Sequence, residues 1–412
     1  MRTRNQIDDA RQAPPPRNSS HVGIPAIEPN FNRRVHCLFG LVWDAVSIEQ
    51  AVETLNTSIA LRRRCHLSTP NANFLRLSQS NCEFRDAVLA SDLCTLDGMP
   101  LVCMARAMGA RAARRVSGAD LFARLQRQSS VKIRGFFLGA DERTGQRLRA
   151  RLGRAEFGVC CVGALAPGFG SIEEMGNPAV ISEINRTNPD LLSVSIGVPK
   201  GLVWLARHER SLTSPVICNL GATIHFAAGT LRRAPAWLGR IGLEWLWRIA
   251  VEPRLFTRYA RDFLALARIL TMRLAPGLML KTLFRPSAAQ LAAAAIGSNA
   301  NSAITILTLG GAWSESNLAP LREHLAQAAR VGGDLTINLD QVTHVDSAFL
   351  GLMLLAYGHQ RRCSRRFALR AAHWRIRASL RFACCDFLFA APAGELPQAP
   401  APHAQLLRAN PF

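Results

Sequence analysis

The chain has 412 residues, 49% of them hydrophobic and 19% charged, which excludes a disordered protein and leaves room for two domains. Fifty lysines and arginines against 29 aspartates and glutamates give a formal net charge of +21, so the expected partners are polyanions: nucleic acid, an anionic membrane face or phosphorylated substrates. The 11 cysteines form no CxxC pair and no Cys/His cluster at zinc-ligand spacing, so reduced cytoplasmic thiols are expected rather than a disulfide framework or a structural metal site.

Residues 1–34 are predicted to form a disordered basic leader. They contain the proline run Pro14 to Pro16 and scattered charges, but no apolar segment of the kind that signal peptides have. No window of 18 uninterrupted apolar residues occurs in the chain, so no membrane span is expected.

Between residues 35 and 230, apolar runs bounded by glycine alternate with amphipathic stretches. The segment VKIRGFFLGADERTGQRLRARL (131–152) predicts a strand, a turn at Gly139 and a helix, and PDLLSVSIGVPKG (189–201) predicts a strand followed by a glycine-containing loop. This alternation favours an α/β fold with a parallel, doubly wound sheet, whose ligands bind beyond the carboxyl ends of the strands.

The stretch CTLDGMPLV (94–102) places Asp97 directly before a glycine. An Asp-Gly pair is a common turn signal, because Asp accepts local backbone hydrogen bonds and Gly tolerates a positive φ. On these residues alone, a turn is favoured over a catalytic carboxylate.

Other polar clusters have two interpretations each. Thr69 and Asn71 in STPNANF (68–74) offer polar groups to a ligand or cap a helix. Arg115 in RRVSGADL (114–121) belongs to a site or to a surface ion pair. The loop GVPKG (197–201) could bind a phosphate through backbone N–H groups or simply connect two elements.

Residues 231–285 are a strongly basic segment. They hold ten arginines and one lysine against Glu244, Glu252 and Asp262, a net charge of +8, interleaved with tryptophan, phenylalanine and tyrosine. Such a helical segment suits the interface between water and an anionic membrane, and it equally suits a solvated basic face over an aromatic core.

The remainder of the chain predicts a second, smaller domain. Residues 286–303 are small and repetitive and read as a linker, residues 304–391 alternate strands and helices in a compact α/β unit, and residues 392–412 are rich in proline and alanine and predict a flexible tail.

Eight motifs in chain order carry a resemblance to one family. They are TPN (69–71), SDLxxxDGxPLV (91–102), RVSGADL (115–121), FFLGA (136–140), NPDLLSVSIGVPK (188–200), GAxxxFxAGTxRRAPxW (221–237), GLEWLWR (242–248) and EPRLFTRY (252–259). Together they resemble the WecG/TagA/CpsF bacterial glycosyltransferases, glycosyltransferase family 26, over roughly residues 36–270. The resemblance implies a Rossmann-like enzyme that transfers a sugar with inversion from a UDP-sugar to a polyprenyl-diphosphate-linked saccharide, without a cofactor or divalent metal, on the cytoplasmic face of the membrane.

The resemblance also implies residue roles. Asp97 matches the aspartate expected to act as general base, and Arg115 matches the arginine expected to assist the departing phosphate. Thr69, Asn71, Gly139, Gly197, Pro199 and Lys200 fall on positions near the donor, and Arg233, Arg248 and Arg258 fall in motifs whose arginines are expected to bind the acceptor diphosphate.

The chain departs from the family at two places. Family members read PKQE where this chain has Pro199, Lys200, Gly201 and Leu202, so a glutamine that helps to hold the donor is missing. His225 stands in place of a family aspartate, and a buried, satisfied histidine is favoured there over a substrate contact.

The segment NLDQVTHVDSAFLGLML (338–354) resembles STAS domains, the fold of anti-sigma-factor antagonists, over residues 302–391. In that family, phosphorylation of the serine or threonine that occupies the position of Ser347 switches partner binding. The same serine could simply begin a helix.

Three hypotheses follow. The first is a membrane-associated glycosyltransferase of exopolysaccharide biosynthesis, whose STAS-like domain contacts a protein partner. The second is a degenerate transferase that serves as a STAS-bearing scaffold of a polysaccharide assembly complex. The third, nucleic-acid binding, explains the charge but not the ordered carboxylate and glycine motifs, so no nucleic-acid partner is expected.

Overall fold

The computed structural model describes residues 29–389, except positions 154, 167, 169, 222, 232, 233, 236, 237, 240, 241 and 302. The expected tail (392–412) and residues 1–28 of the expected leader lie outside the described residues. Residues 29–34 do not behave as a leader. Phe31 is buried, and Arg33 pairs with the buried carboxylate of Asp44 at 2.6 Å, because this segment packs into the core of the molecule.

The larger domain is built on a six-stranded parallel sheet with strand order β4-β3-β8-β7-β5-β6. Its strands are β3 (Cys65–Ser68), β4 (Leu93–Cys94), β5 (Lys132–Leu138), β6 (Gly158–Leu165), β7 (Leu191–Val194) and β8 (Val216–Asn219). The predicted α/β, Rossmann-like fold is confirmed.

Helices cover both faces of this sheet. Those with buried side chains on one face are α1 (Ile48–Ala60), α5 (Gly118–Gln126), α6 (Glu142–Leu152) and α10 (Thr223–Ala228); those on the other are α7 (Ile172–Met175), α8 (Pro178–Arg186) and α9 (Lys200–His208). Each face therefore buries its own hydrophobic layer, as expected for a doubly wound sheet.

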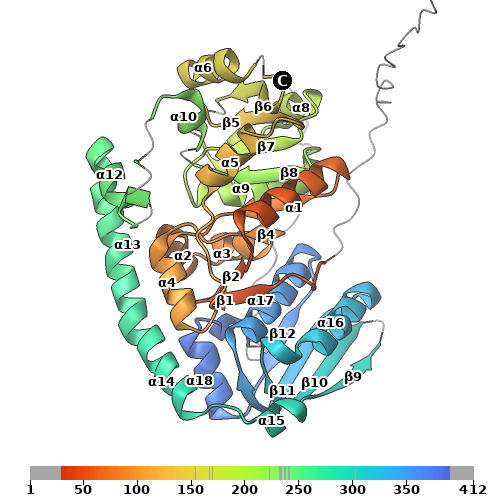
Figure 1. The fold of residues 1–412 in the computed structure, drawn as a ribbon. Coiled ribbons are helices and arrows are strands. Elements are labelled where there is room, and N and C mark those ends of the chain that lie inside the picture. The colour runs from red at the N-terminus through yellow and green to blue at the C-terminus, as the bar shows by residue number, and fades with distance from the viewer. Residues whose placement is uncertain are drawn as a thin grey trace, which may run out of the picture.

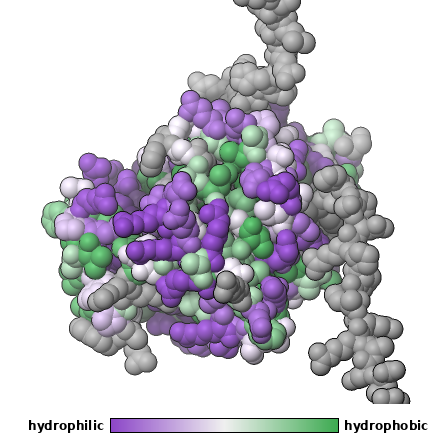
Figure 2. Space-filling model, turned by 90° about the horizontal axis from the view of Figure 1, so that it is seen from above, coloured by the Kyte–Doolittle hydropathy of each residue, from purple (hydrophilic) through white to green (hydrophobic). Residues whose placement is uncertain are grey.

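Figure 2 shows the surface at the end of the molecule that is at the top of Figure 1. Hydrophilic side chains there are interspersed with small patches of hydrophobic ones.

A long helical segment runs along one side of the molecule, from the large domain down to the small one (Figure 1). It consists of α12 (Glu244–Val251), the 3-10 turn η2 (Pro253–Leu255), α13 (Phe256–Ile269), the π-helical turn η3 (Leu270–Leu274) and α14 (Ala275–Leu283). We call this segment the long helix. It packs against α2 (Ala72–Ser78) near its start and against α18 (Trp374–Phe382) near its end.

One helix bears on the expectation of no membrane span, which stays a prediction. Pro253–Leu283 is a 31-residue helix that is long and apolar enough to cross a membrane by length and composition, and 11% of its most apolar window is buried. A search for uninterrupted apolar runs misses it, because Arg268 and Arg273 divide the run from Phe263 to Leu280 into shorter pieces.

The smaller domain contains a four-stranded sheet with order β12-β11-β10-β9. Its elements are α15 (Ala288–Ala292), β9 (Ala295–Ala300), β10 (Ile304–Trp313), α16 (Ala319–Val331), β11 (Asp334–Val345), α17 (Ser347–Arg362), β12 (Phe367–Arg370) and α18. The prediction of a linker over 286–303 is wrong for residues 288–300. Strand β9 pairs antiparallel with β10 from Ala300↔Thr305 to Ala295↔Gly310, since backbone hydrogen bonds do not require large side chains.

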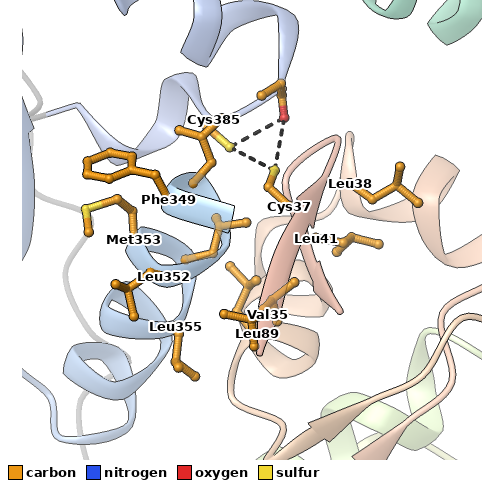
Figure 3. Close-up of a cluster of buried hydrophobic side chains, with 14 of the residues drawn as sticks. Val35, Cys37, Leu38, Leu41, Leu89, Phe349, Leu352, Met353, Leu355 and Cys385 are labelled. Carbon is orange, nitrogen blue, oxygen red and sulfur yellow. Dashed lines mark hydrogen bonds between the residues drawn. The ribbon is translucent and has the colours of Figure 1, made fainter. Parts of the chain in front are cut away.

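The two domains share one hydrophobic core. The hairpin of β1 (Val35–Leu38) and β2 (Leu41–Asp44) packs on α17, and α3 (Cys82–Leu89) and α4 (Met99–Ala107) contribute side chains to the same cluster (Figure 3). Helix α17 packs closely against β1 and α3 because it carries two glycines at the points of contact. A Cβ on Gly351 would lie 2.7 Å from the backbone of His36, and a Cβ on Gly358 would lie 2.2 Å from the carbonyl oxygen of Leu89.

Candidate active site

The loops that follow β3, β4, β5 and β7 meet at the carboxyl edge of the large sheet. The backbone N–H of Asp97 donates to the carbonyl of Pro70 at 2.8 Å, so the loop after β4 continues beside the loop after β3. A Cβ on Gly139 would lie 2.9 Å from the backbone of Ser195, which places the ends of β5 and β7 in contact. The structure therefore gathers Thr69, Asn71, Asp97, Gly139 and Gly197 at one edge of the sheet.

Asp97 lies at a turn whose geometry only glycine adopts readily. Gly98 has φ 125° and ψ 133° and precedes the first residue of α4. The side chain of Asp97 is 30% exposed, and its Oδ1 lies 3.9 Å from Nη2 of Arg115. The turn and the site are therefore compatible, because Gly98 makes the turn while the carboxylate faces an arginine.

Arg115 connects three carboxylates. Its guanidinium pairs with Glu244 at 2.6 Å and with Asp120 at 3.1 Å, in addition to the longer contact with Asp97. Ser117, the N-cap of α5, donates to Asp120 Oδ2 at 2.7 Å and so orients that carboxylate. Arg115 thereby links the catalytic edge of the sheet to the start of the long helix.

Glu244 was not identified as a site residue from the sequence, although a signal for it was present. It is one of only three acidic residues among residues 231–285, and all three are ion-paired. Glu244 pairs with Arg115 and Asp262 with Arg76, both arginines of the large domain, while Glu252 pairs with Arg248. Two of the three acids in this basic segment thus mark points at which it docks on the large domain.

The three arginines predicted to bind the diphosphate of the acceptor substrate have different surroundings. Arg248 pairs with Glu252 at 2.7 Å and lies 5.7 Å from the ring centroid of Phe226. Arg258 lies over the ring of Tyr259 at 4.7 Å, and no described residue accepts from its buried Nε. Arg233 lies outside the described residues.

Tyr259 is a further candidate that sequence reasoning treated only as an interfacial aromatic. Burial raises the pKa of its hydroxyl above the ordinary value; the negative charge of Asp97 acts in the same direction, and the charges of Arg258 and Arg248 act against it. The phenol therefore lies within electrostatic range of Asp97 at the carboxyl edge of the sheet.

The structure explains the departure from the family at Gly201 and Leu202, which lie in the first turn of α9. A Cβ on Gly201 would lie 2.4 Å from Nδ2 of Asn219 and 2.5 Å from the carbonyl oxygen of Ile196, so a glutamine does not fit without rearrangement. Asn219 ends β8 and donates to that carbonyl at 3.3 Å, and Leu202 is fully buried in the core. An asparagine carboxamide from β8 therefore occupies the space beside the glycine.

The other residues predicted to lie near the sugar donor differ in how many of their groups already have partners within the protein. Gly197 is exposed and a Cβ there would meet nothing within 4 Å, so there is space beside it, although its carbonyl accepts from the N–H of Gly201 at 3.1 Å. Lys200 already donates through Nζ to the carbonyl of Gly170. Pro199 is the residue before α9, and Asn71 accepts from the N–H of Phe74 at 3.2 Å as the N-cap of α2.

Thr69 and His225 have defined neighbours. Thr69 is buried, and a Cβ on Gly118 would lie 3.4 Å from its Oγ1, which brings the TPN and RVSGADL motifs into contact. Half-buried His225 shares a 3.2 Å hydrogen bond between Nδ1 and Oγ1 of Thr230. Among the described residues, no group of three or more His, Cys, Asp and Glu side chains is arranged to hold a metal ion.

Ser347 lies at the contact between the two domains. Its Oγ is 3.2 Å from Nδ1 of His36 on β1, and its side chain is half-buried at the first turn of α17. Asp346 is the N-cap of this helix, accepting from Phe349. Phosphorylation of Ser347 stays a prediction, and its nearest partner here is the large domain of the same chain.

Comparisons with known proteins agree with this architecture. A sequence model described as "Glycosyl transferase WecG/TagA/CpsF family" matches residues 36–277, and one described as "Mlab, STAS domain" matches residues 296–386. An N-acetylglucosaminyldiphosphoundecaprenol N-acetyl-beta-D-mannosaminyltransferase of Bacillus subtilis is 24% identical over 188 residues, 45% of this chain and 72% of the relative. A Staphylococcus aureus protein of the same name is 22% identical over 229 residues, 55% of this chain and 88% of the relative.

Proposed function

Because the chain belongs to the WecG/TagA/CpsF family of glycosyl transferases, we propose that it moves a sugar from a UDP-sugar to a polyprenyl-diphosphate-linked saccharide, with inversion at the anomeric carbon. The observation that carries the proposal is the pairing of Asp97 with Arg115 at the carboxyl edge of the sheet, 3.9 Å apart. The names of the two relatives support a lipid-diphosphate acceptor.

The geometry suggests a division of roles. Asp97 takes the proton from the acceptor hydroxyl as that oxygen bonds to the anomeric carbon, and the bond from this carbon to the diphosphate of UDP breaks. Arg115 stabilises the negative charge that develops on the departing diphosphate. Tyr259 and Arg258, on the first turns of α13, lie where the acceptor diphosphate would approach.

The proposal includes transfer without a divalent ion. The positive charge that a metal would bring to the diphosphates is supplied here by arginine side chains, which bind phosphate oxygens in a bidentate manner.

We test the proposal with the full-length chain, UDP-sugars including UDP-N-acetylmannosamine, and N-acetylglucosaminyl-diphosphoundecaprenol as the first acceptor. We expect release of UDP that depends on both substrates and is unchanged by excess EDTA, measured as UDP formed and as glycolipid product. Release that EDTA abolishes and Mg²⁺ or Mn²⁺ restores would contradict the metal-free mechanism. A second acceptor series with other lipid-linked sugars identifies the saccharide.

One observation favours the alternative of a degenerate transferase that acts as a scaffold. Gly201 and Leu202 replace the donor-binding pair of the family, and Asn219 fills the adjoining space. The scaffold hypothesis predicts no turnover with any donor and acceptor pair while the protein remains folded and still binds membranes. Turnover with any donor and acceptor pair would rule out the scaffold hypothesis.

The proposal also places the protein on the cytoplasmic face of the cell membrane, in the synthesis of an exopolysaccharide or another surface polysaccharide. The long helix presents a row of exposed apolar side chains: Phe256, Phe263, Leu264, Leu270, Met272, Met279 and Leu283. Basic residues flank this row, a pattern that suits an anionic bilayer surface.

Replacing Phe263 and Leu264 by serine is expected to weaken binding to vesicles that contain phosphatidylglycerol by about tenfold or more, because these side chains are 74% and 72% exposed and would enter the bilayer. Vesicle co-sedimentation measures this. Leu61→Ser is the matched control, since Leu61 is 58% exposed at the end of α1, outside the long helix. Equal binding by the double variant, or binding to DNA in preference to vesicles, would contradict the membrane assignment.

A further inference from the structure

A cavity of about 90 Å³ lies at the junction of three parts of the chain, and Asp97 and Arg115 are not among the residues that line it. Its walls come from the end of the long helix, from α17 and α18 of the small domain, and from Phe39 and Met108 of the large domain. In Figure 1, α14 and α18, which line the cavity, lie at the opposite end of the long helix from α12, which carries Glu244. It is therefore separate from the proposed active site.

Hydrogen-bond donors dominate the polar lining of this cavity. Arg273 comes from the π-helical turn η3, Lys281 from α14 and Arg375 from α18, so three cations from separate elements converge. Asp346 is the one carboxylate in the lining, and both of its oxygens already accept backbone N–H groups, from Phe349 at 2.8 Å and from Glu315 at 2.9 Å. The lining thus has excess positive charge and no free carboxylate oxygen to balance it.

Arg375 gives a second, independent indication of a missing acceptor. Its guanidinium carbon lies 4.1 Å from the ring centroid of Phe284 and 5.8 Å from that of Trp374. Its Nε is buried, and no described residue accepts a hydrogen bond from it. The guanidinium as a whole is only partly buried, so Nε is a single unsatisfied donor, and an acceptor oxygen in the cavity would satisfy it.

The walls between these cations determine which anion fits. Leu278, Ile376 and Phe382 supply apolar surface, while Ser347 and the first turn of the 16-residue helix α17 add the partial positive charge of a helix N-terminus. An anion with several acceptor oxygens and an adjoining apolar body matches both halves of the lining.

We propose that this junction cavity binds a phosphate group carried on an apolar body, held by Arg273, Lys281 and Arg375. Such a ligand bridges the long helix and the small domain, which are joined at this place by the hydrogen bond from Arg273 to the carbonyl of Arg381 at 2.8 Å. Binding would therefore stabilise the angle at which the long helix leaves the large domain.

The test measures the thermal unfolding midpoint of the full-length chain with three probes: dihexanoyl phosphatidic acid below its micellar concentration, inorganic phosphate, and dihexanoylglycerol, which lacks the phosphate. We expect the phosphatidic acid to raise the midpoint by at least about 2 °C at saturation, because a ligand that binds only the folded state stabilises it. Dihexanoylglycerol is expected to leave the midpoint unchanged.

Variants locate the effect. Arg375→Gln and Lys281→Gln should each reduce the ligand-induced shift by half or more, whereas Arg377→Gln, on the same helix but exposed and outside the lining, should retain it. Each shift is measured against the same variant without ligand, so a change in the variant's own stability does not affect the comparison.

The outcomes separate the sources of the phosphate. A larger shift with phosphatidic acid than with inorganic phosphate supports a phosphate carried on an apolar body. An equal shift with inorganic phosphate would show that the apolar walls add nothing, and would overturn that part of the proposal. No shift with either probe, or a shift that Arg375→Gln and Lys281→Gln leave intact, would overturn the whole proposal. The readout does not involve sugar transfer, so this inference and the proposed function fail independently.

Discussion

Asp97→Asn is expected to lower the rate of sugar transfer by at least about 10²-fold, the usual scale for loss of a general base. Asparagine keeps the size of the side chain and the turn at Gly98, but its amide cannot take the proton from the acceptor hydroxyl. Steady-state release of UDP from the wild-type chain and the variant measures the effect, and an unchanged unfolding midpoint shows that the fold is retained.

Asp120→Asn is the matched control for this experiment. Asp120 and Asp97 have similarly exposed side chains, 33% and 30%, and both face Arg115, at 3.1 Å and 3.9 Å. If Asp97 is the base, the Asp120 variant retains most of its activity. Equal losses in the two variants would show that these carboxylates serve only to orient Arg115.

Arg115→Met is expected to lower transfer by about 10²–10³-fold, because it removes the charge that we propose stabilises the departing diphosphate. It also removes the ion pairs from Arg115 to Glu244 and to Asp120, and the loss of the first should loosen the start of the long helix. Transfer kinetics measure the first effect, and faster amide hydrogen exchange over Glu244–Val251 measures the second.

Two further variants separate these roles. Glu244→Gln removes the docking ion pair but keeps the guanidinium at the site, so it should speed exchange in α12 with a smaller loss of transfer than Arg115→Met. Arg124→Gln, an exposed change on α5, should alter neither measurement. Identical losses of transfer in Glu244→Gln and Arg115→Met would assign Arg115 to docking rather than to charge stabilisation.

The catalytic edge could be predicted largely from local sequence. Strands followed by glycine and polar residues produce parallel strands whose carboxyl ends carry Thr69, Asn71 and Asp97, and the family motifs identify which of these matter. The partners of Arg115 could not be predicted in the same way. Glu244 lies 129 residues further along the chain, and no periodic pattern links the two positions.

In the small domain, too, local features could be predicted from the sequence and long-range contacts could not. Its resemblance to STAS domains was visible in residues 338–354, but its relation to the large domain was not. A linker was expected before it because residues 286–303 are small, yet β9 forms there and α17 packs on β1 and β2. Gly351 and Gly358 allow this packing, and a glycine within a helix gives no indication of which surface will approach it.

Short-range properties therefore established the α/β class, the family and the turn at Gly98, because turn preference, strand alternation and motif spacing act over a few residues. Tertiary structure decided the rest. It brought Glu244 and Tyr259 to the catalytic edge, filled the space beside Gly201 with Asn219, and joined the two domains in one core. These contacts arise from burial of surfaces far apart in the chain, and that burial depends on how the complete fold packs.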